Sequence, residues 1–248
     1  MSSREEIARL ERAALWAWPP AETASVAGWL LRAGGAASRR LNSATTLAFE
    51  PGIDPGEAIG RVEAWYAARG RPACFHLTEA AMPVGLDELL AARGYRRRTP
   101  SLVMVRALVP GQGASGEGIE LETRPRAGFM EAVADPARNT RLRAERAAVY
   151  ARIRRPHVFA VDFRDGVPAA GGVCVVTEGT AVLHSMRTRP EYRRRGCARA
   201  ILARLLAWGA AMGARRAMLQ VEEANAPARG LYEAAGFRPV YRYHYRER

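Results

Sequence analysis

Along the second half of the chain, segments in which apolar residues recur every second residue alternate with segments in which they recur every three to four residues. This pattern predicts strands interleaved with helices. The expected strands cover residues 119–123, 157–164, 170–176, 180–187, 217–222 and 240–246. The expected helices cover residues 128–151, with an interruption at Asp135-Pro136, and residues 196–212 and 225–236. Asp165-Gly166 and Glu178-Gly179 are hairpin turn signals, so the strands around them should pair in antiparallel.

The first half shows a similar order less clearly. Its expected elements are a helix to about residue 15, strands at 28–33 and 40–47, a helix at 55–68, a strand at 73–77, a helix at 86–92 and a strand at 101–108. Gly94-Tyr95 follows the helix at 86–92, as Gly236-Phe237 follows the last helix of the second half. Residues 109–117 lack apolar periodicity and are rich in glycine, which predicts a linker between domains of residues 1–108 and 118–248.

Composition indicates a globular protein with a core of ordinary size. The 248 residues are 48% hydrophobic, and no apolar run approaches the roughly 18–20 residues that span a membrane. The charged, amphipathic N-terminus does not resemble a signal peptide, so we expect a cytoplasmic location. Cys74, Cys174 and Cys197 are too scattered for a disulfide framework, and no group of side chains has metal-ligand spacing, so no metal is expected.

The net charge of +13 raises the question of nucleic-acid binding, because strongly basic domains often bind nucleic acids. All 38 basic residues are arginine, however, and the chain contains no lysine. Together with the abundance of alanine, glycine and proline, this bias indicates a property of the whole coding sequence rather than a basic patch. We therefore do not expect nucleic-acid binding. A positive field does suit an anionic small ligand.

An arginine-rich turn at residues 186–198 is the clearest candidate for a binding site. Arg193-Arg194-Arg195 stands directly before Gly196, at the expected start of a helix. The first N–H groups of a helix are unpaired and lie at the positive end of its dipole, so they bind phosphate well. Gly196 and Ala198 are small enough to let a pyrophosphate approach the backbone. The alternative is an ordinary solvated helix start in an arginine-rich chain.

This turn and a second motif together resemble the GCN5-related N-acetyltransferases, the GNAT family. Residues 193–198 fit the pattern Arg/Gln-x-x-Gly-x-Gly/Ala, and residues 225–237 fit Asn-x-x-Ala-x-x-Leu-Tyr-x-x-x-Gly-Phe. The resemblance is specific for residues 118–248 and faint before them. It implies an α/β fold of the α+β kind, with two acetyltransferase-like domains, each a mixed, mostly antiparallel sheet flanked by helices.

The resemblance also implies one donor site per chain, in the second domain. The loop at residues 50–55 of the first domain is acidic where coenzyme A would need positive charge, so this domain is interpreted as degenerate. Domains of the family usually end in two strands, yet only eleven residues follow Phe237, enough for one. We therefore predict that the strand at 101–108 closes the sheet of the second domain or joins the two sheets.

By the same resemblance, acetyl-CoA is the acyl donor. Backbone N–H groups of residues 186–188 would bind the pantetheine arm and polarise the acetyl carbonyl, and Tyr232 would protonate the departing thiolate. Tyr232 alternatively packs beside the coenzyme, and Asn225 either bonds the pantetheine arm or only caps a helix. The residues that this hypothesis places on the donor are Met186, Arg187, Thr188, Arg193, Arg194, Arg195, Gly196, Cys197, Ala198, Arg199, Asn225 and Tyr232.

The general base is less well defined. Glu222 ends the strand before Asn225, where its carboxylate could take a proton from an ammonium directly or through water. His184 ranks second because its ordinary pKa suits proton transfer, although a lone strand histidine is more often structural. Some members of the family use no dedicated base.

Two further features have open interpretations. Cys197 at a helix N-terminus could be a low-pKa thiolate, but a small side chain that fills the motif is the favoured interpretation. The aromatic row near the C-terminus could line an acceptor pocket or form only a paired strand; it comprises Tyr241, Tyr243, His244 and Tyr245.

The leading hypothesis is an N-acetyltransferase that moves an acetyl group from acetyl-CoA to a primary amine by direct transfer in a ternary complex. The alternatives are a protein acetyltransferase acting on an N-terminus or a lysine, and a non-catalytic module that senses acyl-CoA. The arginine turn and Tyr232 favour an enzyme. The sequence leaves open the identity of the amine acceptor and whether the chain is a monomer or a homodimer.

Overall fold

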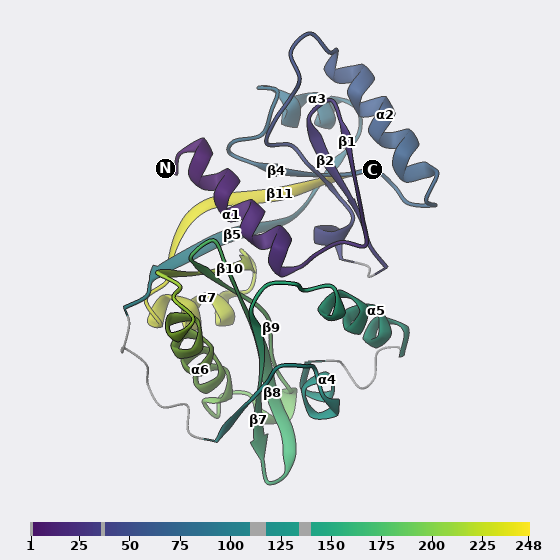
Figure 1. Ribbon diagram of the computed structural model, residues 1–248. Helices are drawn as coiled ribbons and strands as arrows, with labels where there is room; N and C mark the ends of the chain where they lie inside the picture. The colour runs from purple at the N-terminus through teal and green to yellow at the C-terminus, as the bar shows by residue number, and fades with distance from the viewer. Residues whose placement is uncertain (1, 36–37, 110–117, 134–139) are drawn as a thin grey trace.

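The computed structural model describes residues 2–35, 38–109, 118–133 and 140–248 (Figure 1). The strands are β1 (Glu22–Val26), β2 (Trp29–Ala33), β3 (Ala44–Thr45), β4 (Cys74–Thr78), β5 (Arg96–Ala107), β6 (Ile119–Glu122), β7 (His157–Arg164), β8 (Val167–Thr177), β9 (Thr180–Thr188), β10 (Arg216–Glu222) and β11 (Arg238–Glu247). The helices are α1 (Arg4–Ala17), α2 (Pro55–Ala67), α3 (Leu86–Ala92), α4 (Ala127–Val133), α5 (Thr140–Ala151), α6 (Cys197–Ala211) and α7 (Ala226–Ala234), with short 3-10 turns η1 (Arg39–Leu41) and η2 (Pro190–Tyr192).

These strands form one 11-stranded sheet in the order β1-β2-β3-β4-β11-β5-β10-β9-β8-β7-β6. Neighbours β3/β4 and β9/β10 run parallel, whereas the other described pairs are antiparallel. The expected α/β fold with a mixed, mostly antiparallel sheet is therefore confirmed. The order strand, helix, parallel strand, helix, strand occurs twice, as β3-α2-β4-α3-β5 and as β9-α6-β10-α7-β11.

We refer to residues 2–109 as the N-terminal half and to residues 118–248 as the C-terminal half. Their division into separate domains stays a prediction, because most of the expected linker lies outside the described residues. The expected interruption at Asp135-Pro136 also lies outside them, between α4 and α5.

The last strand of each half pairs with strands of the other half. β5 lies between β10 and β11 and pairs in antiparallel with both; on the β10 side, Ser101 is opposite Glu222. β11 in turn lies between β5 and β4, with Tyr243 opposite Thr78. Strands β10 and β11 are thus joined through β5. The expectation that the strand at 101–108 joins the two sheets is confirmed, and this strand begins earlier than expected, at Arg96.

Helices cover both faces of the C-terminal half. A Cβ atom added at Gly171 on β8 would meet Val133 and Phe129 of α4, whereas one added at Gly172 would meet Ile201 and Leu205 of α6. Since successive strand residues point to opposite faces, α4 and α6 lie on opposite sides of the sheet. Both contacts are close enough to require glycine, so α6 is held tightly against the strand that precedes β9.

Helix α1 belongs by sequence to the N-terminal half but packs on both halves. Ser3 caps it by accepting a hydrogen bond from the Glu6 N–H at 3.2 Å, which starts the helix. Its apolar stripe is fully buried in a core cluster with residues of α4, β8, β9 and β11. The buried positions of this stripe are Ile7, Leu10, Ala13, Ala14 and Ala17.

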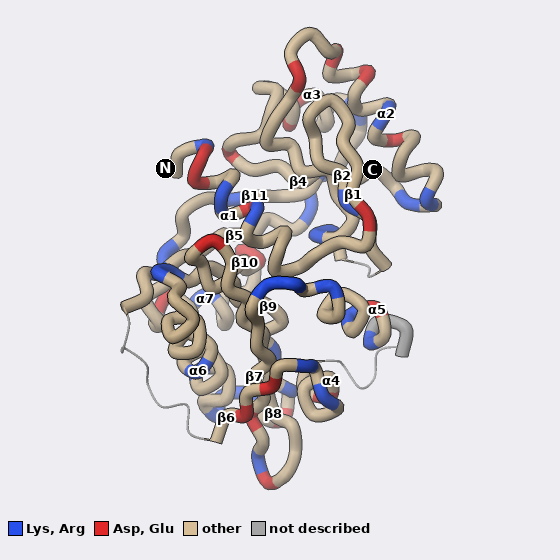
Figure 2. The backbone as a smooth tube through the Cα atoms, in the orientation of Figure 1, with Lys and Arg blue, Asp and Glu red and all other residues tan. Residues whose placement is uncertain are grey.

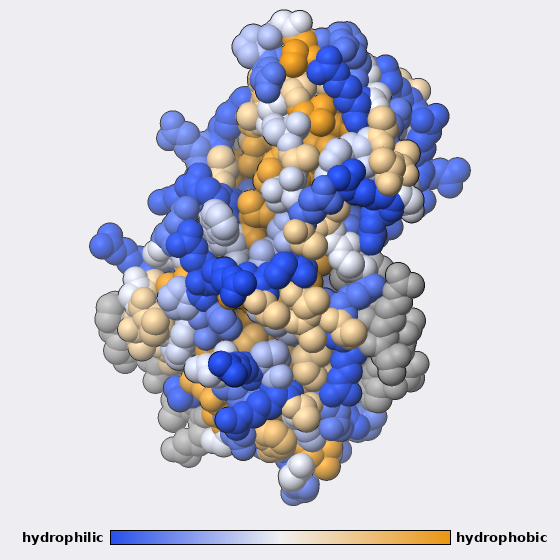
Figure 3. Space-filling model, turned by 45° about the vertical axis from the view of Figure 1, so that its right-hand side comes forward, coloured by the Kyte–Doolittle hydropathy of each residue, from blue (hydrophilic) through white to orange (hydrophobic). Residues whose placement is uncertain are grey.

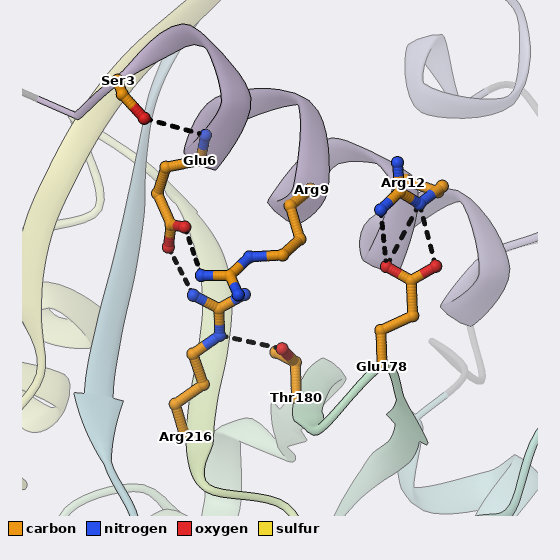
Figure 4. A network of polar contacts seen from close by, with 7 residues as sticks. All are labelled: Ser3, Glu6, Arg9, Arg12, Glu178, Thr180 and Arg216. Atoms are coloured by element: carbon orange, nitrogen blue, oxygen red, sulfur yellow. Dashed lines mark hydrogen bonds and ion pairs between the residues drawn. The ribbon is translucent and has the colours of Figure 1, made fainter.

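Polar contacts also attach α1 to the C-terminal half (Figure 4). Arg12 Nε donates to Glu178 Oε1 at 2.8 Å, and Arg216 pairs with Glu6 while donating to Thr180 Oγ1 at 2.9 Å. Exposed ion pairs of this kind contribute only about 0–1 kcal/mol each. Burial of a single leucine or isoleucine side chain contributes about 1.5–3 kcal/mol. The apolar stripe therefore holds α1 in place, and the ion pairs fix its register.

Two expectations for the N-terminal half were wrong. Residues 40–47 do not form a continuous strand, because η1 occupies residues 39–41 and only Ala44–Thr45 pairs as a strand. The Asn42 side chain accepts from the Gly34 N–H at 2.9 Å and donates to the Ser38 carbonyl at 3.0 Å, so local bonds replace strand pairing. Strand β1 was not expected, since it is an edge strand whose half-exposed residues lack a clear alternation.

Charged residues occur throughout both halves. Figure 2 shows arginine and acidic positions interspersed in most helices and loops, and the face in Figure 3 has hydrophilic residues spread over its whole extent. None of the described helices is long and apolar enough to cross a bilayer.

The strand exchange predicts that the C-terminal half does not fold alone. A fragment that starts at Gly118 lacks both β5, the shared partner of β10 and β11, and the apolar stripe of α1. We expect it to be aggregated or to melt without a cooperative transition, and to regain one when residues 1–109 are added as a separate chain. Circular dichroism and size-exclusion chromatography would test this. A fragment that is soluble, monomeric and as stable as the whole chain would show that the exchange is dispensable.

Candidate active site

Strands β9 and β10 diverge to form a fork in the sheet. They pair in parallel as far as Leu183 opposite Leu219, after which β9 continues along β8 and β10 continues along β5. An extra residue in β9 causes a bulge opposite Gly172, and Ser185 there adopts a positive φ of 55°. Beyond Leu183, the edge of β9 that faces β10 therefore has no partner among the described strands, and its backbone groups border the gap.

The arginine turn leads from the end of β9 into α6. Positive φ angles at Arg194 (62°) and Gly196 (82°) reverse the chain after η2. Gly196 is the N-cap residue and offers no side-chain hydrogen bond, so the first N–H groups of α6 have no capping side chain. A Cβ atom at Gly196 would meet nothing within 4 Å, so the space beside the helix start is open. The open helix start expected from the sequence is thus present, and anion binding there stays a prediction.

A cavity of about 780 Å³ lies on this turn; we call it the arginine-turn cavity. It contains all residues predicted for the donor except Arg195, whose guanidinium lies over the Tyr192 ring at 5.5 Å. No carboxylate is found among its described lining residues, which are Met186, Arg187, Thr188, Tyr192, Arg193, Arg194, Gly196, Cys197, Ala198, Arg199, Asn225, Pro227, Ala228, Leu231 and Tyr232. The cavity is therefore suited to an anionic ligand.

A second cavity, of about 480 Å³, lies on the other side of the fork and is lined by both halves; we call it the inter-half cavity. The N-terminal half contributes Ser38, Arg39, Arg40, Thr99 and Ser101. The C-terminal half contributes Leu183, His184, Ser185, Met186, Leu219, Gln220, Val221, Glu222, Asn225, Ala228, Tyr232, Tyr243 and Tyr245. The two cavities share Met186, Asn225, Ala228 and Tyr232, so they meet at the bulge of β9 and the first turns of α7.

Tyr232 lies at this meeting point. It is buried on α7, with its ring 6.1 Å from that of Phe237, and burial raises the pKa of its hydroxyl to about 12. The phenol therefore stays protonated through the neutral range and can donate a proton. Asn225 caps α7 by accepting from the Ala228 N–H at 3.2 Å, so the capping interpretation holds whether or not a ligand also binds there.

Two other titratable groups near the fork favour their neutral forms. Cys197 is buried with its Sγ 3.6 Å from the Tyr192 carbonyl oxygen, and burial is the main reason that the pKa of this thiol is raised. His184 packs against the rings of Trp18 and Tyr150, and burial together with the charge of Arg40 lowers its pKa to about 3. Its Nδ1 atom lies 3.1 Å from Ser185 Oγ.

Glu222 and Glu223 differ in position. Glu222 ends β10, is exposed and lines the inter-half cavity. Glu223 is not among the described residues that line it and pairs instead with Arg242 at 3.2 Å. The two neighbouring carboxylates therefore differ in their surroundings, and only Glu222 borders the cavity within the described lining.

The members of the aromatic row near the C-terminus have different surroundings. Tyr243 and Tyr245 line the inter-half cavity. Tyr241 instead donates to the buried Glu11 at 2.7 Å, and His244 lies 2.9 Å from Asp87. Neither Tyr241 nor His244 reaches the described lining, so only alternate residues of the row border the cavity.

Sequence patterns did not single out several lining residues, among them Arg39, Arg40, Thr99, Ser101 and Tyr192. The first four come from the N-terminal half and reach the fork only because β5 and β11 are exchanged. Tyr192 had a local signal, since it lies within the arginine-rich turn at residues 186–198. Among the described residues, no cluster of three His, Cys, Asp or Glu side chains could hold a metal ion.

Comparison with known proteins identifies the family of the chain. The family model of the "Probable histone acetyltransferase Rv0428c C-terminal" matches residues 4–246. The chain is 28% identical over 251 residues to the uncharacterized N-acetyltransferase YobR of Bacillus subtilis, covering 98% of both chains.

Two solved structures share the fold. A GCN5-related N-acetyltransferase from Kribbella flavida has a TM-score of 0.67 at 20% identity, covering 97% of this chain and 94% of that one. A tandem GNAT protein from the clavulanic acid biosynthesis pathway has a TM-score of 0.65 at 16% identity, covering 97% of this chain and 87% of that one. The chain therefore belongs to the GCN5-related N-acetyltransferases, within the family of the Rv0428c C-terminal region, and is an acyltransferase.

Proposed function

We propose that the protein transfers an acetyl group from acetyl-CoA to a primary amine directly, within a ternary complex. The observation that carries this proposal is the meeting of two cavities at the fork of β9 and β10. One cavity is basic and borders a helix N-terminus, and the other borders Glu222. A donor in the first and an acceptor in the second would bring the thioester and the amine together beside Met186 and Tyr232.

Acetyl-CoA suits the charge of the arginine-turn cavity and the open space beside the start of α6. Its pyrophosphate would accept hydrogen bonds from the first N–H groups of α6 and from the arginines of the turn. Its pantetheine arm would lie in the gap beside β9, where N–H groups of residues 186–188 are candidates to polarise the acetyl carbonyl. Arg195 contributes at most through its backbone in this arrangement, because its side chain lies on Tyr192.

The proton transfers follow from the positions of Glu222 and Tyr232. Glu222 would take a proton from the substrate ammonium, directly or through water, so that the amine can attack the thioester carbon. A C–N bond forms, the C–S bond breaks, and the Tyr232 hydroxyl protonates the sulfur; the proton released by the new amide nitrogen restores the phenol. His184 is the weaker candidate for the base, since a pKa of about 3 makes its imidazole a poor proton acceptor.

The proposal includes a cytoplasmic location. Two competing functions, a protein acetyltransferase and an acyl-CoA sensor, can be tested directly. A cytoplasmic location is consistent with three free, buried cysteines. Purified protein should release coenzyme A thiol from acetyl-CoA in the presence of some members of an amine panel. Turnover only with peptides would indicate a protein acetyltransferase, and binding without turnover would indicate an acyl-CoA sensor.

Replacement of Tyr232 by phenylalanine separates proton donation from packing. The ring and its contact with Phe237 remain, so affinity for acetyl-CoA should stay within a few-fold. Because general acid catalysis contributes about a hundred- to ten-thousandfold, kcat should fall by that order. Steady-state kinetics and calorimetry would measure the two quantities. Near-normal kcat with weakened acetyl-CoA binding would mean that this tyrosine only packs.

Replacement of Gly196 by glutamate tests the donor site. The side chain would place a negative charge in the open space beside the α6 N-terminus, so acetyl-CoA affinity should fall by about a hundredfold or more, through the loss of charge-assisted hydrogen bonds. Gly196→Ala is the matched control, because it carries the same backbone strain at positive φ without the charge, and we expect about a tenfold effect at most. Equal calorimetric affinities for a folded Gly196→Glu protein and the alanine control would contradict the assignment.

A further inference from the structure

We infer that the acceptor is a small amine that also carries a carboxylate, held by Arg40 in the inter-half cavity with its amine toward Glu222. This inference rests on the proposed function and adds to it the chemical class of the acceptor. It assigns a binding role to a residue of the N-terminal half, for which the arginine turn and the Asn225 motif give no indication.

Arg40 reaches the cavity through the exchange of strands. It lies in η1, and its half-buried side chain borders the cavity together with Tyr243 and Tyr245 of β11. The guanidinium forms a hydrogen bond with the Tyr243 hydroxyl, whereas its buried Nε atom has no hydrogen-bond partner among the described residues. A buried donor without a partner costs free energy, which a ligand oxygen can offset by accepting from it. The cavity is thus bordered by a guanidinium that has one donor without a partner among the described residues, and a guanidinium is the group best suited to a carboxylate.

The charges around the cavity fit a ligand with both signs. Arg39, the neighbouring cation, is neutralised by Glu247 at 2.7 Å. Glu11 of α1 interacts electrostatically with Arg40, but burial raises the pKa of this carboxyl, and the Tyr241 hydroxyl donates to it. Within the described part of the chain, no carboxylate forms an ion pair with Arg40, and no cation forms one with Glu222. An amine that carries a carboxylate supplies both missing partners.

The size of the cavity favours a small molecule over a polypeptide. Its volume of about 480 Å³ lies in the usual range for small-molecule sites. A competing explanation is that Arg40 only supports the packing of the two halves, since it also borders a small internal space beside Ala17 and Trp18. That explanation predicts a loss of stability without a change in acceptor preference.

The test uses matched acceptors with the intact protein and saturating acetyl-CoA. Each set contains an amino acid, its carboxamide and the amine that lacks the carboxyl group. For the wild type, we expect kcat/KM to be at least tenfold higher for the acid than for the other two. Arg40→Gln should lower this ratio by at least tenfold, whereas Arg40→Lys, which keeps the charge, should lower it less.

Arg61→Gln is the matched control, because it removes an exposed arginine on α2 that pairs with the nearby Glu57 and does not line the inter-half cavity. It should leave the ratio unchanged, and acetyl-CoA affinity by calorimetry would report whether each variant is folded. Equal use of acid, carboxamide and amine by the wild type would overturn the inference, as would an equal loss for all three in Arg40→Gln. If Arg40→Gln does not fold, the wild-type ratio and Arg40→Lys decide. Absence of turnover with every amine would contradict the proposed function itself.

Discussion

The exchange of β5 and β11 is the constraint on which the rest of the structure depends. Each of these strands is the last strand of its own half, and each lies between two strands of the other half. The exchange completes both parts of the sheet, because the C-terminal half has only one strand after α7. It also explains why α1 can bury its apolar stripe on residues that lie far away in the sequence.

The same exchange supplies the surroundings of the fork. Where β10 leaves β9 it pairs with β5, so Ser101 of the N-terminal half lies opposite Glu222. The tyrosines of β11 face the same cavity, and η1 adds Arg39 and Arg40. The arginine-turn cavity is different, because it is lined by C-terminal residues in the part of the chain that the structure describes. The family motifs therefore account for the arginine-turn cavity, whereas the exchange of strands determines the lining of the inter-half cavity.

Local patterns predicted most of the elements and most residues that line the arginine-turn cavity. Helix α3 was expected at the residues where it occurs, and the turn into α6 was recognised because arginine, glycine and helical periodicity are adjacent in sequence. The prediction of a strand at 40–47 was wrong, because the Asn42 side chain makes local hydrogen bonds that the hydrophobic pattern does not reveal. Arg40, Thr99 and Ser101 could not be predicted as lining residues, since their contacts with the fork depend on long-range pairing. The burial that lowers the pKa of His184 is likewise a property of the packed core.

Hydrogen–deuterium exchange with and without acetyl-CoA tests the central claim, a single donor site at the fork, most directly. N–H groups of β9 beyond Leu183 and of the first turn of α6 would become hydrogen-bonded to the ligand or shielded by it. The account predicts slower exchange in residues 186–199 and 225–232, with no change in the corresponding loop of the N-terminal half at residues 50–57. Protection of residues 50–57, or exchange that acetyl-CoA leaves unchanged at the fork under saturating conditions, would contradict it.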